Sequence, residues 1–303
     1  MACYVPVKLF YIAGALLLGI GAAIGVARLN SATNVSSVPG RASGCGFPAA
    51  TGSVNLTAKD GENRTRSYQI QVPSDYDPGH PYALTFVFHG AGGNAAASRS
   101  WGLQNAPGAG SQGIFVFPNG INFQHDGIGW DDRSNGYDVP FFDHMLRELA
   151  SGYCIDPGQV FAAGFSWGGD FAITLACTRG DVLRAVAANS TDDEFKDTAN
   201  YLTYVNLPCS SRKHPPVRYS HAEGGDQMYP APDFATTSKL LQHLNACNGA
   251  STGIASSTSS QVCVSYDGCA ARYIECSFDH DIGHTLPPKW AEDTWGFFRN
   301  TAR

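Results

Sequence analysis

"FAAGFSWGGDF", from Phe161 to Phe171, surrounds Ser166 with closely spaced glycines. The apolar residues of "QVFAAGF" before the serine predict a buried β-strand, and "GGDFAITLAC" after it predicts a helix. The pattern G-x-S-x-G at a strand-to-helix turn is typical of a nucleophile elbow, in which small neighbours let the serine adopt a strained backbone conformation. A flexible linker would not join two such apolar runs. A structural serine within a chance cluster of glycines is the remaining alternative.

Strands and helices alternate along the rest of the chain. The apolar runs "YALTFVFHG" and "GIFVFPNG" predict strands that are buried on both faces, and "VLRAVAANS" and "PPVRYSHAEG" predict further strands. Apolar residues at helical spacing in "VPFFDHMLREL", "FATTSKLLQHLNAC" and "KWAEDTWGFFRN" predict helices. This order indicates an α/β fold with a mainly parallel sheet. The polar stretch "NGASTGIASSTSSQ", which ends at Gln261, is expected to be a surface loop.

The N-terminal segment differs in composition from the remainder. An apolar run of about 19 residues lies between Lys8 and Arg28, a length between that of a signal-peptide core and that of a membrane-spanning helix. Residues 1–28 are therefore predicted to be a signal peptide or an uncleaved N-terminal anchor, and either would export the remainder. Residues 29–44 are small and polar and predict a flexible tether. Residues 45–303 are expected to form one folded domain.

Composition and charge limit the class of protein. Of the 303 residues, 43% are hydrophobic and 15% are charged, which is typical of a globular protein. The net charge of −6, without a long basic run, argues against nucleic acid as a partner. A membrane contact is expected only through the N-terminal segment.

Cysteines and sequons are consistent with export. The chain has nine cysteines, of which Cys3 precedes the apolar run. The others form an even set that suggests disulfides, with the pairing left open: Cys45, Cys154, Cys177, Cys209, Cys247, Cys263, Cys269 and Cys276. A zinc site fits less well, because no short paired spacing with histidine occurs. Sequons that would carry glycans in a eukaryotic host occur at Asn34, Asn55, Asn63 and Asn189.

A reactive serine needs a base within hydrogen-bonding reach and a carboxylate that orients the base. After an elbow of this type the acid comes next in the chain and the histidine last. Asp226 in "YSHAEGGDQMYP" and His284 in "DHDIGHTLPP" fit this order. Asp233 is the competing acid, although its place at a predicted helix start suggests a cap. His280, in the same loop as His284, is the competing base.

Two backbone N–H groups are expected to stabilise a developing oxyanion. One belongs to Trp167, directly after the serine. The other is expected from Ala91 in "HGAGGN", where the glycines allow a close approach of the backbone. His89 is expected to form hydrogen bonds within this loop rather than to act as the base.

Aromatic residues in loops that follow strands are candidates for binding a phenolic acyl group, because open α/β sheets bind ligands at that edge. The candidates are Trp130, Trp101 and Tyr229. Packing in the core or within a loop is the alternative for each of them.

Several stretches beyond the elbow resemble one group of secreted esterases. They are "RSYQIQVPSDYDPGHPYALTFVFHG", "WGLQ", "GWDD", "CIDPGQVFAAGFSWGG", "SHAEGGD", and "YDGC" ahead of "GHTLP". From Cys45 to the last predicted helix, the chain resembles the feruloyl esterase and polyhydroxybutyrate depolymerase-like family, within the first carbohydrate esterase family. The resemblance implies an α/β-hydrolase fold with a mainly parallel central sheet and helices on both faces.

The resemblance also implies ester hydrolysis through an acyl-enzyme, without a metal or an organic cofactor. Ser166 would attack, His284 would take and return the proton, and Asp226 would orient the imidazole. The expected substrate is a feruloylated plant cell-wall polysaccharide or its fragments. "HGAGGN" and "HAEGGD" depart from the pattern of feruloyl esterases. A polyhydroxybutyrate depolymerase, an acetylxylan esterase and a non-catalytic binding module on the same fold therefore remain alternatives.

The position of three cysteines leads to one further hypothesis. Cys263, Cys269 and Cys276 lie shortly before His284. Disulfides at these residues would fix the histidine loop, so that export and oxidation prepare the catalytic geometry.

Overall fold

The computed structural model describes most of the predicted folded domain. The described residues are 44–123, 127–192, 209, 211, 213–223, 225–229, 231–256, 258–278 and 283–301, and all lie in the unit Val35–Arg303. The predicted signal peptide or anchor and the predicted tether, apart from Gly44, lie outside these ranges, as do Cys3, Asn34 and His280. Among the helices of the described ranges, none is long and apolar enough to cross a membrane.

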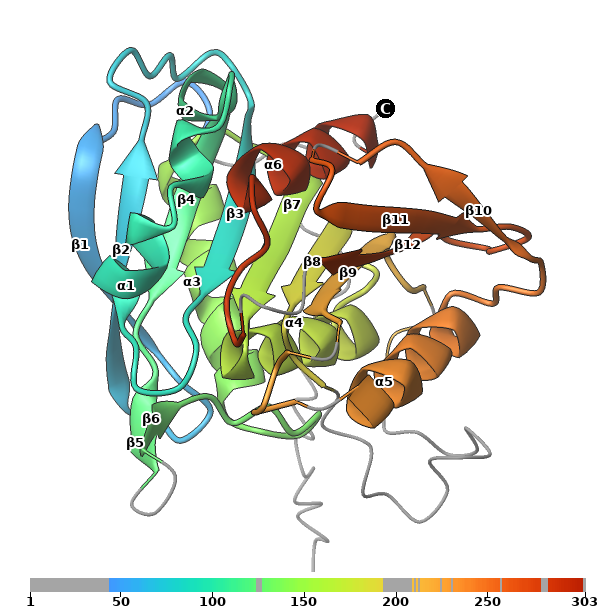
Figure 1. The fold of residues 1–303 in the computed structure, drawn as a ribbon. Coiled ribbons are helices and arrows are strands. Elements are labelled where there is room, and N and C mark those ends of the chain that lie inside the picture. The colour runs from blue at the N-terminus through green and yellow to red at the C-terminus, as the bar shows by residue number, and fades with distance from the viewer. Residues whose placement is uncertain are drawn as a thin grey trace, which may run out of the picture. The chain divides into compact units, whose positions relative to one another are not determined.

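A ten-stranded sheet forms the centre of the fold, with the strand order β1-β2-β4-β3-β7-β8-β9-β12-β11-β10 (Figure 1). The strands are β1 (Gly52–Lys59), β2 (Thr65–Val72), β3 (Tyr82–Phe88), β4 (Gly113–Pro118), β7 (Ile155–Phe165), β8 (Ala185–Asn189), β9 (Val217–Ala222), β10 (Ser251–Ile254), β11 (Gln261–Tyr266) and β12 (Tyr273–Phe278). The central strands from β4 to β12 are parallel, and the strands at both edges pair antiparallel. A separate hairpin consists of β5 (Ile121–Phe123) and β6 (Gly127–Gly129).

Helices cover both faces of the sheet (Figure 1). They are α1 (Ala95–Ser100), the short 3-10 helix η1 (Leu103–Asn105), α2 (Ala109–Gln112), α3 (Asp138–Gly152), α4 (Trp167–Thr178), α5 (Ala231–Leu244) and α6 (Trp290–Thr301). One core cluster joins the sheet to α3, α4 and α5, and a second joins it to α1, α2 and α6. In β3, Leu84 and Phe86 enter the first cluster while Ala83 and Val87 enter the second. Both faces of this strand are therefore apolar, and the predicted α/β architecture, a mainly parallel sheet with helices on both faces, is confirmed.

One sequence-based expectation about the fold is wrong. The stretch that ends at Gln261, expected to be a loop, contains β10. This strand pairs antiparallel with β11, with Ser251 opposite Tyr266. Its side chains are mostly exposed, so no apolar pattern marks it, and the strand is defined by its pairing with β11.

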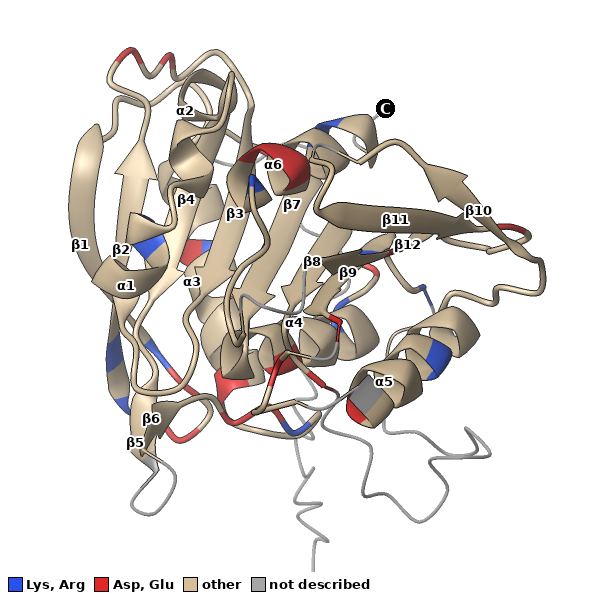
Figure 2. Cartoon of the chain, viewed as in Figure 1, with Lys and Arg blue, Asp and Glu red and all other residues tan. Residues whose placement is uncertain are grey.

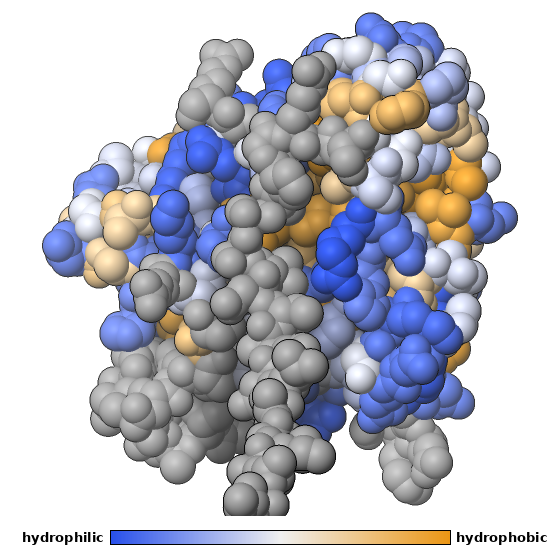
Figure 3. Space-filling view, turned by 180° about the vertical axis from the view of Figure 1, so that it is seen from behind, coloured by the Kyte–Doolittle hydropathy of each residue, from blue (hydrophilic) through white to orange (hydrophobic). Residues whose placement is uncertain are grey.

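The eight described cysteines form four disulfides, as their number and context predicted. The pairs are Cys45–Cys154, Cys177–Cys209, Cys247–Cys269 and Cys263–Cys276. Of the described sequons, Asn55 and Asn63 are exposed, whereas Asn189 is 1% exposed and donates its side-chain amide to the Gly164 carbonyl. Burial therefore excludes a glycan at Asn189. Seen from behind, hydrophilic residues cover much of the described surface, with apolar patches between them (Figure 3).

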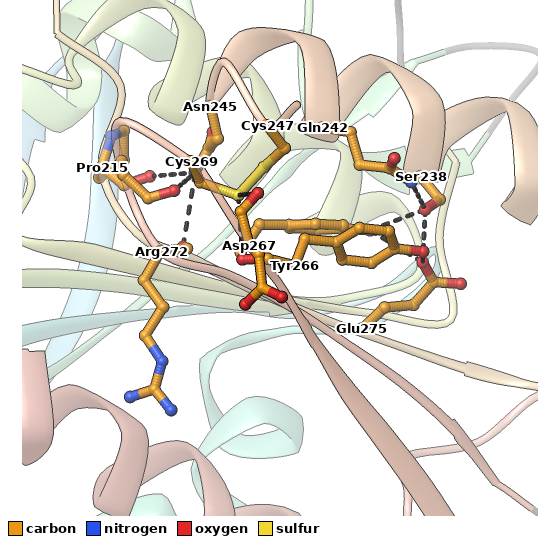
Figure 4. Close-up of a disulfide and its surroundings, with 12 residues drawn as sticks. Pro215, Ser238, Gln242, Asn245, Cys247, Tyr266, Asp267, Cys269, Arg272 and Glu275 are labelled. Atoms are coloured by element: carbon orange, nitrogen blue, oxygen red, sulfur yellow. Dashed lines mark hydrogen bonds between the residues drawn. A yellow bond between two sulfur atoms is a disulfide. The ribbon is translucent and has the colours of Figure 1, made fainter. Parts of the chain in front are cut away.

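The Cys247–Cys269 disulfide fastens the end of α5 to the turn between β11 and β12 (Figure 4). Close to it, the Asn245 side chain donates to the Pro215 carbonyl at 3.1 Å. Further along β12, Glu275 accepts hydrogen bonds from the Tyr266 hydroxyl at 3.1 Å and from the Ser238 hydroxyl. These contacts fix α5 against β12. The chain after β12 contains His284, and the chain after β9 contains Asp226.

Candidate active site

Ser166 lies at the sharp turn between β7 and α4. Its backbone has φ 55° and ψ −134°, and its surface is 6% exposed. A Cβ atom at Gly164 would lie 1.9 Å from the Gly168 carbonyl oxygen, and a Cβ atom at Gly168 would lie 2.2 Å from the Phe88 carbonyl oxygen. Both separations are shorter than atoms tolerate, so the two glycines of the motif are required by the close packing of β7, α4 and β3.

Hydrogen bonds from the end of β8 hold this turn. The N–H of Ser166 donates to the Asn189 carbonyl at 3.0 Å, and the Asn189 side chain donates to the Gly164 carbonyl at 3.0 Å. The Thr191 hydroxyl lies 2.8 Å from the Ser166 carbonyl oxygen, to which it can donate. The unfavourable backbone conformation at Ser166 is thus maintained by partners on a neighbouring strand.

Asp226 and His284 form a hydrogen bond although they are far apart in the chain. His284 Nδ1 lies 2.8 Å from Asp226 Oδ2. The other oxygen of Asp226 accepts from the backbone N–H groups of Met228 at 2.9 Å and Tyr229 at 3.1 Å. Asp226 is 4% exposed, and its three hydrogen-bond partners fix the direction of its carboxylate.

His284 lies beside the elbow. Its ring centroid is 4.8 Å from that of Phe165, the residue before Ser166, and 5.5 Å from that of Tyr229. The Ser190 hydroxyl donates to the Thr285 carbonyl at 2.8 Å, which ties the histidine loop to the end of β8. The competing acid is not part of this arrangement, because Asp233 lies in the first turn of α5.

The loop that contains Ala91 also reaches the elbow. A Cβ atom at Gly90 would lie 3.1 Å from the Cβ atom of Ser166, so the two backbones approach closely. The N–H of the exposed Ala91 has no acceptor within the part of the chain that the structure describes. The next N–H, that of Gly92, donates to the Ile128 carbonyl at 2.8 Å and so attaches this loop to the β5–β6 hairpin.

His89 forms one hydrogen bond within its own loop, as the sequence predicted, and a second with the loop after β4. Its Nε2 accepts from the N–H of Gly120 at 2.9 Å, so its proton must lie on Nδ1, which contacts the Gly90 carbonyl at 2.8 Å. Burial lowers the pKa of His89 below its ordinary value and keeps the ring neutral. A neutral His89 therefore fixes the carbonyl just before Ala91.

Trp130 does not have the predicted contact with substrate, because its side chain is completely buried. Its ring stacks on Phe171 with 5.5 Å between the centroids, and its Nε1 donates to the His89 carbonyl at 2.8 Å. Trp130 thus supports the Ala91 loop from beneath. The sequence places this residue directly after β6 but does not show that its side chain points into the core.

The other aromatic candidates, Trp101 and Tyr229, remain partly exposed, as does Trp167 directly after the nucleophile. The Trp101 ring lies edge-on to Phe165 at 5.8 Å and to Trp290 at 5.9 Å. The Trp167 indole packs closely on Gly129, because a Cβ atom at Gly129 would lie 2.2 Å from the indole ring. Tyr229 directs its hydroxyl inward, 3.3 Å from Asp170 Oδ2.

Acidic residues gather in the loops at the edge of the sheet where α4 begins (Figure 2). Asp170 lies in the first turn of α4 and is missing from the predicted site. Burial raises its pKa well above the ordinary value, and the nearby Asp192 raises it further. Within the described ranges, no group of three or more His, Cys, Asp and Glu side chains could hold a metal ion.

Curated relatives support an esterase. The chain is 30% identical over 271 residues to feruloyl esterase C of Emericella nidulans, covering 84% of this chain and 90% of the relative. It is also 30% identical over 276 residues to a probable feruloyl esterase C of Aspergillus clavatus, covering 85% of this chain and 90% of the relative. The chain belongs to the feruloyl esterase C family. No model of a known protein family matches it.

Solved structures support the fold of this feruloyl esterase C family member. An acetyl xylan esterase from Aspergillus awamori has a TM-score of 0.60 at 15% identity, covering 81% of this chain and 99% of the other. Esterase PE8 has a TM-score of 0.52 at 17% identity, covering 81% of this chain and 100% of the other. The family identifies the chain as a carboxylic ester hydrolase, and these neighbours support its α/β-hydrolase fold.

Proposed function

We propose that this esterase releases hydroxycinnamic acids from feruloylated plant cell-wall polysaccharide, with Ser166, His284 and Asp226 as its catalytic residues. The observation that carries the catalytic assignment is the 2.8 Å contact between His284 and Asp226 beside a serine whose backbone has φ 55°. The substrate class rests on the names of the relatives, a feruloyl esterase C and a probable feruloyl esterase C. The alignment with this chain covers 90% of the length of each.

In the proposed mechanism, the Nδ1–H group of His284 donates a hydrogen bond to Asp226. Nε2 therefore carries no proton and accepts the proton of the Ser166 hydroxyl. The serine oxygen then attacks the ester carbonyl carbon, and the carbonyl oxygen gains negative charge. The N–H groups of Ala91 and Trp167 would donate to this oxygen. Trp167 is the first residue of α4, so the positive end of the helix dipole also lies there.

The tetrahedral intermediate collapses when His284 returns the proton to the leaving alcohol oxygen and the carbon–oxygen bond to the alcohol breaks. Ferulate is then bound to Ser166 as an ester. Water attacks this acyl-enzyme, His284 takes a proton from the water and passes it to Ser166, and the free acid leaves.

Exposed apolar side chains near the elbow support an aromatic acyl group. Ile128, in β6, is 39% exposed and its carbonyl accepts from Gly92, whereas Met228, in the loop after β9, is 68% exposed and its N–H donates to Asp226. Phe165 adds a partly buried ring beside His284, and the partly buried Trp101 ring packs edge-on against Phe165. We propose that this surface binds the phenolic ring of the substrate, with Trp101 and Tyr229 as contacts.

Two experiments test the proposal. Replacing Ser166 with alanine should abolish labelling by an organophosphonate, and labelling of another serine would contradict the assignment. A panel of methyl ferulate, acetylated xylan and polyhydroxybutyrate then tests the substrate class. The proposal requires the highest kcat/KM on methyl ferulate, and preference for either of the other two would replace it with that activity.

The location of the enzyme is part of the proposal. The four disulfides indicate an oxidising, extracellular environment. We propose that residues 1–28 direct export, either as a cleaved signal or as an anchor. Determination of the N-terminus of the secreted protein distinguishes the two, and retention of the full chain in the cytoplasm would contradict both.

A further inference from the structure

The β5–β6 hairpin contacts both backbone segments that contain the proposed oxyanion donors. It pairs Ile121 with Gly129 and is separate from the ten-stranded sheet (Figure 1). The proposed mechanism gives this hairpin no role. Its contacts nevertheless reach the loop after β3 and the first residue of α4, which supply one donor each.

Three hydrogen bonds attach the loop after β3 to the hairpin and to the residues beside it. The N–H of Gly120, before β5, donates to His89 Nε2 at 2.9 Å. The N–H of Gly92 donates to the carbonyl of Ile128, in β6, at 2.8 Å. Trp130, directly after β6, donates its Nε1–H to the His89 carbonyl at 2.8 Å. These bonds fix the backbone on both sides of the proposed donor in this loop.

The same hairpin packs against the residue that carries the other proposed donor. A Cβ atom at Gly129, the last residue of β6, would lie 2.2 Å from the Trp167 indole ring. The φ angle of Gly129 lies outside the left-handed region, so glycine is required at this position for space. A Cβ atom at Gly120 would lie 2.4 Å from the Gly129 carbonyl oxygen, so the two ends of the hairpin also pack closely on each other.

The distance between the two donors decides how well they bind an oxyanion. Both N–H groups must reach one oxygen at about 2.7–3.1 Å. Because one hairpin contacts both segments, a shift of the hairpin would move one donor relative to the other. Within the described part of the chain, no hydrogen bond joins the hairpin to Asp226 or His284. A change in the hairpin should therefore leave the base and its orienting acid in place.

We propose that the β5–β6 hairpin sets the distance between the two oxyanion donors, with Gly129 and Trp130 as positioning residues. Gly129 lets the Trp167 indole lie against the hairpin, and Trp130 holds the carbonyl of His89 through its Nε1–H. The inference rests on the proposed catalytic residues and donors but not on the feruloyl substrate.

Two substitutions disturb the hairpin contacts separately. Trp130→Phe keeps an aromatic ring beside Phe171 but removes the Nε1–H donor. Gly129→Ala places a methyl group against the Trp167 ring. We expect kcat/KM for p-nitrophenyl acetate to fall about 10-fold to 100-fold in each, with an unchanged acidic limb of the pH profile. Gly253→Ala in β10 is the matched control, because a Cβ atom there meets open space, and it should leave kcat/KM unchanged.

A pair of ketone inhibitors separates positioning from general damage to the site. The Ser166 oxygen adds to the carbonyl carbon of an aryl trifluoromethyl ketone, its proton passes to His284, and the ketone oxygen becomes an oxyanion. The matching methyl ketone binds without this addition. The affinity for the trifluoromethyl ketone should fall in proportion to kcat/KM in Gly129→Ala and Trp130→Phe, while the affinity for the methyl ketone stays within about twofold of the wild type. Equal loss of affinity for both ketones would overturn the inference.

A double variant tests whether Gly129 acts through the indole. In a Trp167→Ala background, Gly129→Ala should lower kcat/KM by less than about twofold, because the methyl group no longer meets a ring. Full additivity of the two losses would refute the proposed contact. If thermal unfolding shows that Trp130→Phe is not folded, Gly129→Ala decides alone. Activity that persists in Ser166→Ala would refute the proposed function and this inference with it, whereas an inactive Ser166→Ala with unaffected hairpin variants would refute the inference alone.

Discussion

Replacing Asp226 with asparagine should change the tautomer of His284 while leaving the fold intact. One carboxylate oxygen of Asp226 accepts the N–H groups of Met228 and Tyr229, and the other lies 2.8 Å from His284 Nδ1. In Asp226→Asn the amide oxygen must remain on the two backbone donors, so the NH₂ group is directed at Nδ1. Nδ1 then accepts a hydrogen bond, and the ring proton moves to Nε2. An imidazole with a proton on Nε2 cannot take the proton of Ser166.

The loss expected from such a tautomer change is about 10⁴-fold in kcat, by analogy with the corresponding substitution in serine proteases. It is measured with p-nitrophenyl acetate, and the midpoint of thermal unfolding confirms that the variant is folded. Asp233→Asn is the matched control, since it removes the competing carboxylate in the first turn of α5. Activity of Asp226→Asn within tenfold of the wild type, or a large loss in Asp233→Asn, would refute the reasoning.

Three further outcomes follow from the structure. Met228→Ser should lower kcat/KM for methyl ferulate about threefold to tenfold, because apolar contact area is lost, and should affect p-nitrophenyl acetate less. Val262 is 65% exposed but lies outside the loops of the site, so Val262→Ser should change kcat/KM for neither substrate. Because the pKa of His89 is lowered in the folded protein, the unfolded chain binds a proton at this residue at a higher pH than the folded chain does. Stability should therefore decrease below about pH 6.5, and His89→Gln should reduce that slope in thermal unfolding. Replacing both Cys263 and Cys276 with serine should lower the free energy of unfolding by about 3 kcal/mol. An unchanged kcat in this double variant would argue against a role of the disulfide in fixing the histidine loop.

The elbow could be predicted from sequence because its requirements are local. Gly164 and Gly168 stand two residues on either side of Ser166, and the structure shows that a Cβ atom at either glycine would overlap backbone oxygens. β7 is apolar from Val160 to Phe165, and α4 is buried from Gly168 to Thr178 with Asp170 as its one charged residue, which is the pattern of elements covered on both sides. The order of acid and histidine then follows from the fold, and the structure places Asp226 and His284 in contact.

Other features could not be read from the sequence because they depend on tertiary pairing. Trp130 was expected to face the substrate, yet it is buried, since the direction of a side chain after a short hairpin strand is set by packing on Phe171. β10 has no apolar pattern and exists through its pairing with β11. Asp170 did carry a signal that was not used. It is the one charged residue in a helix that is otherwise apolar, and such an isolated acid needs a partner or a proton.

The two acids near Ser166 differ in the donors that surround them. Asp226 receives only N–H donors, from His284 and from the backbone, and a carboxylate oxygen accepts these without a proton of its own. Asp170 accepts hydrogen bonds from the hydroxyl groups of Thr191 and Tyr229 and from the N–H of Asp192. Tyr229 belongs to both environments, with its N–H on one acid and its hydroxyl on the other. Tyr229 therefore joins the acid that we propose to orient the base to a second buried acid, and a substitution of Tyr229 should affect both.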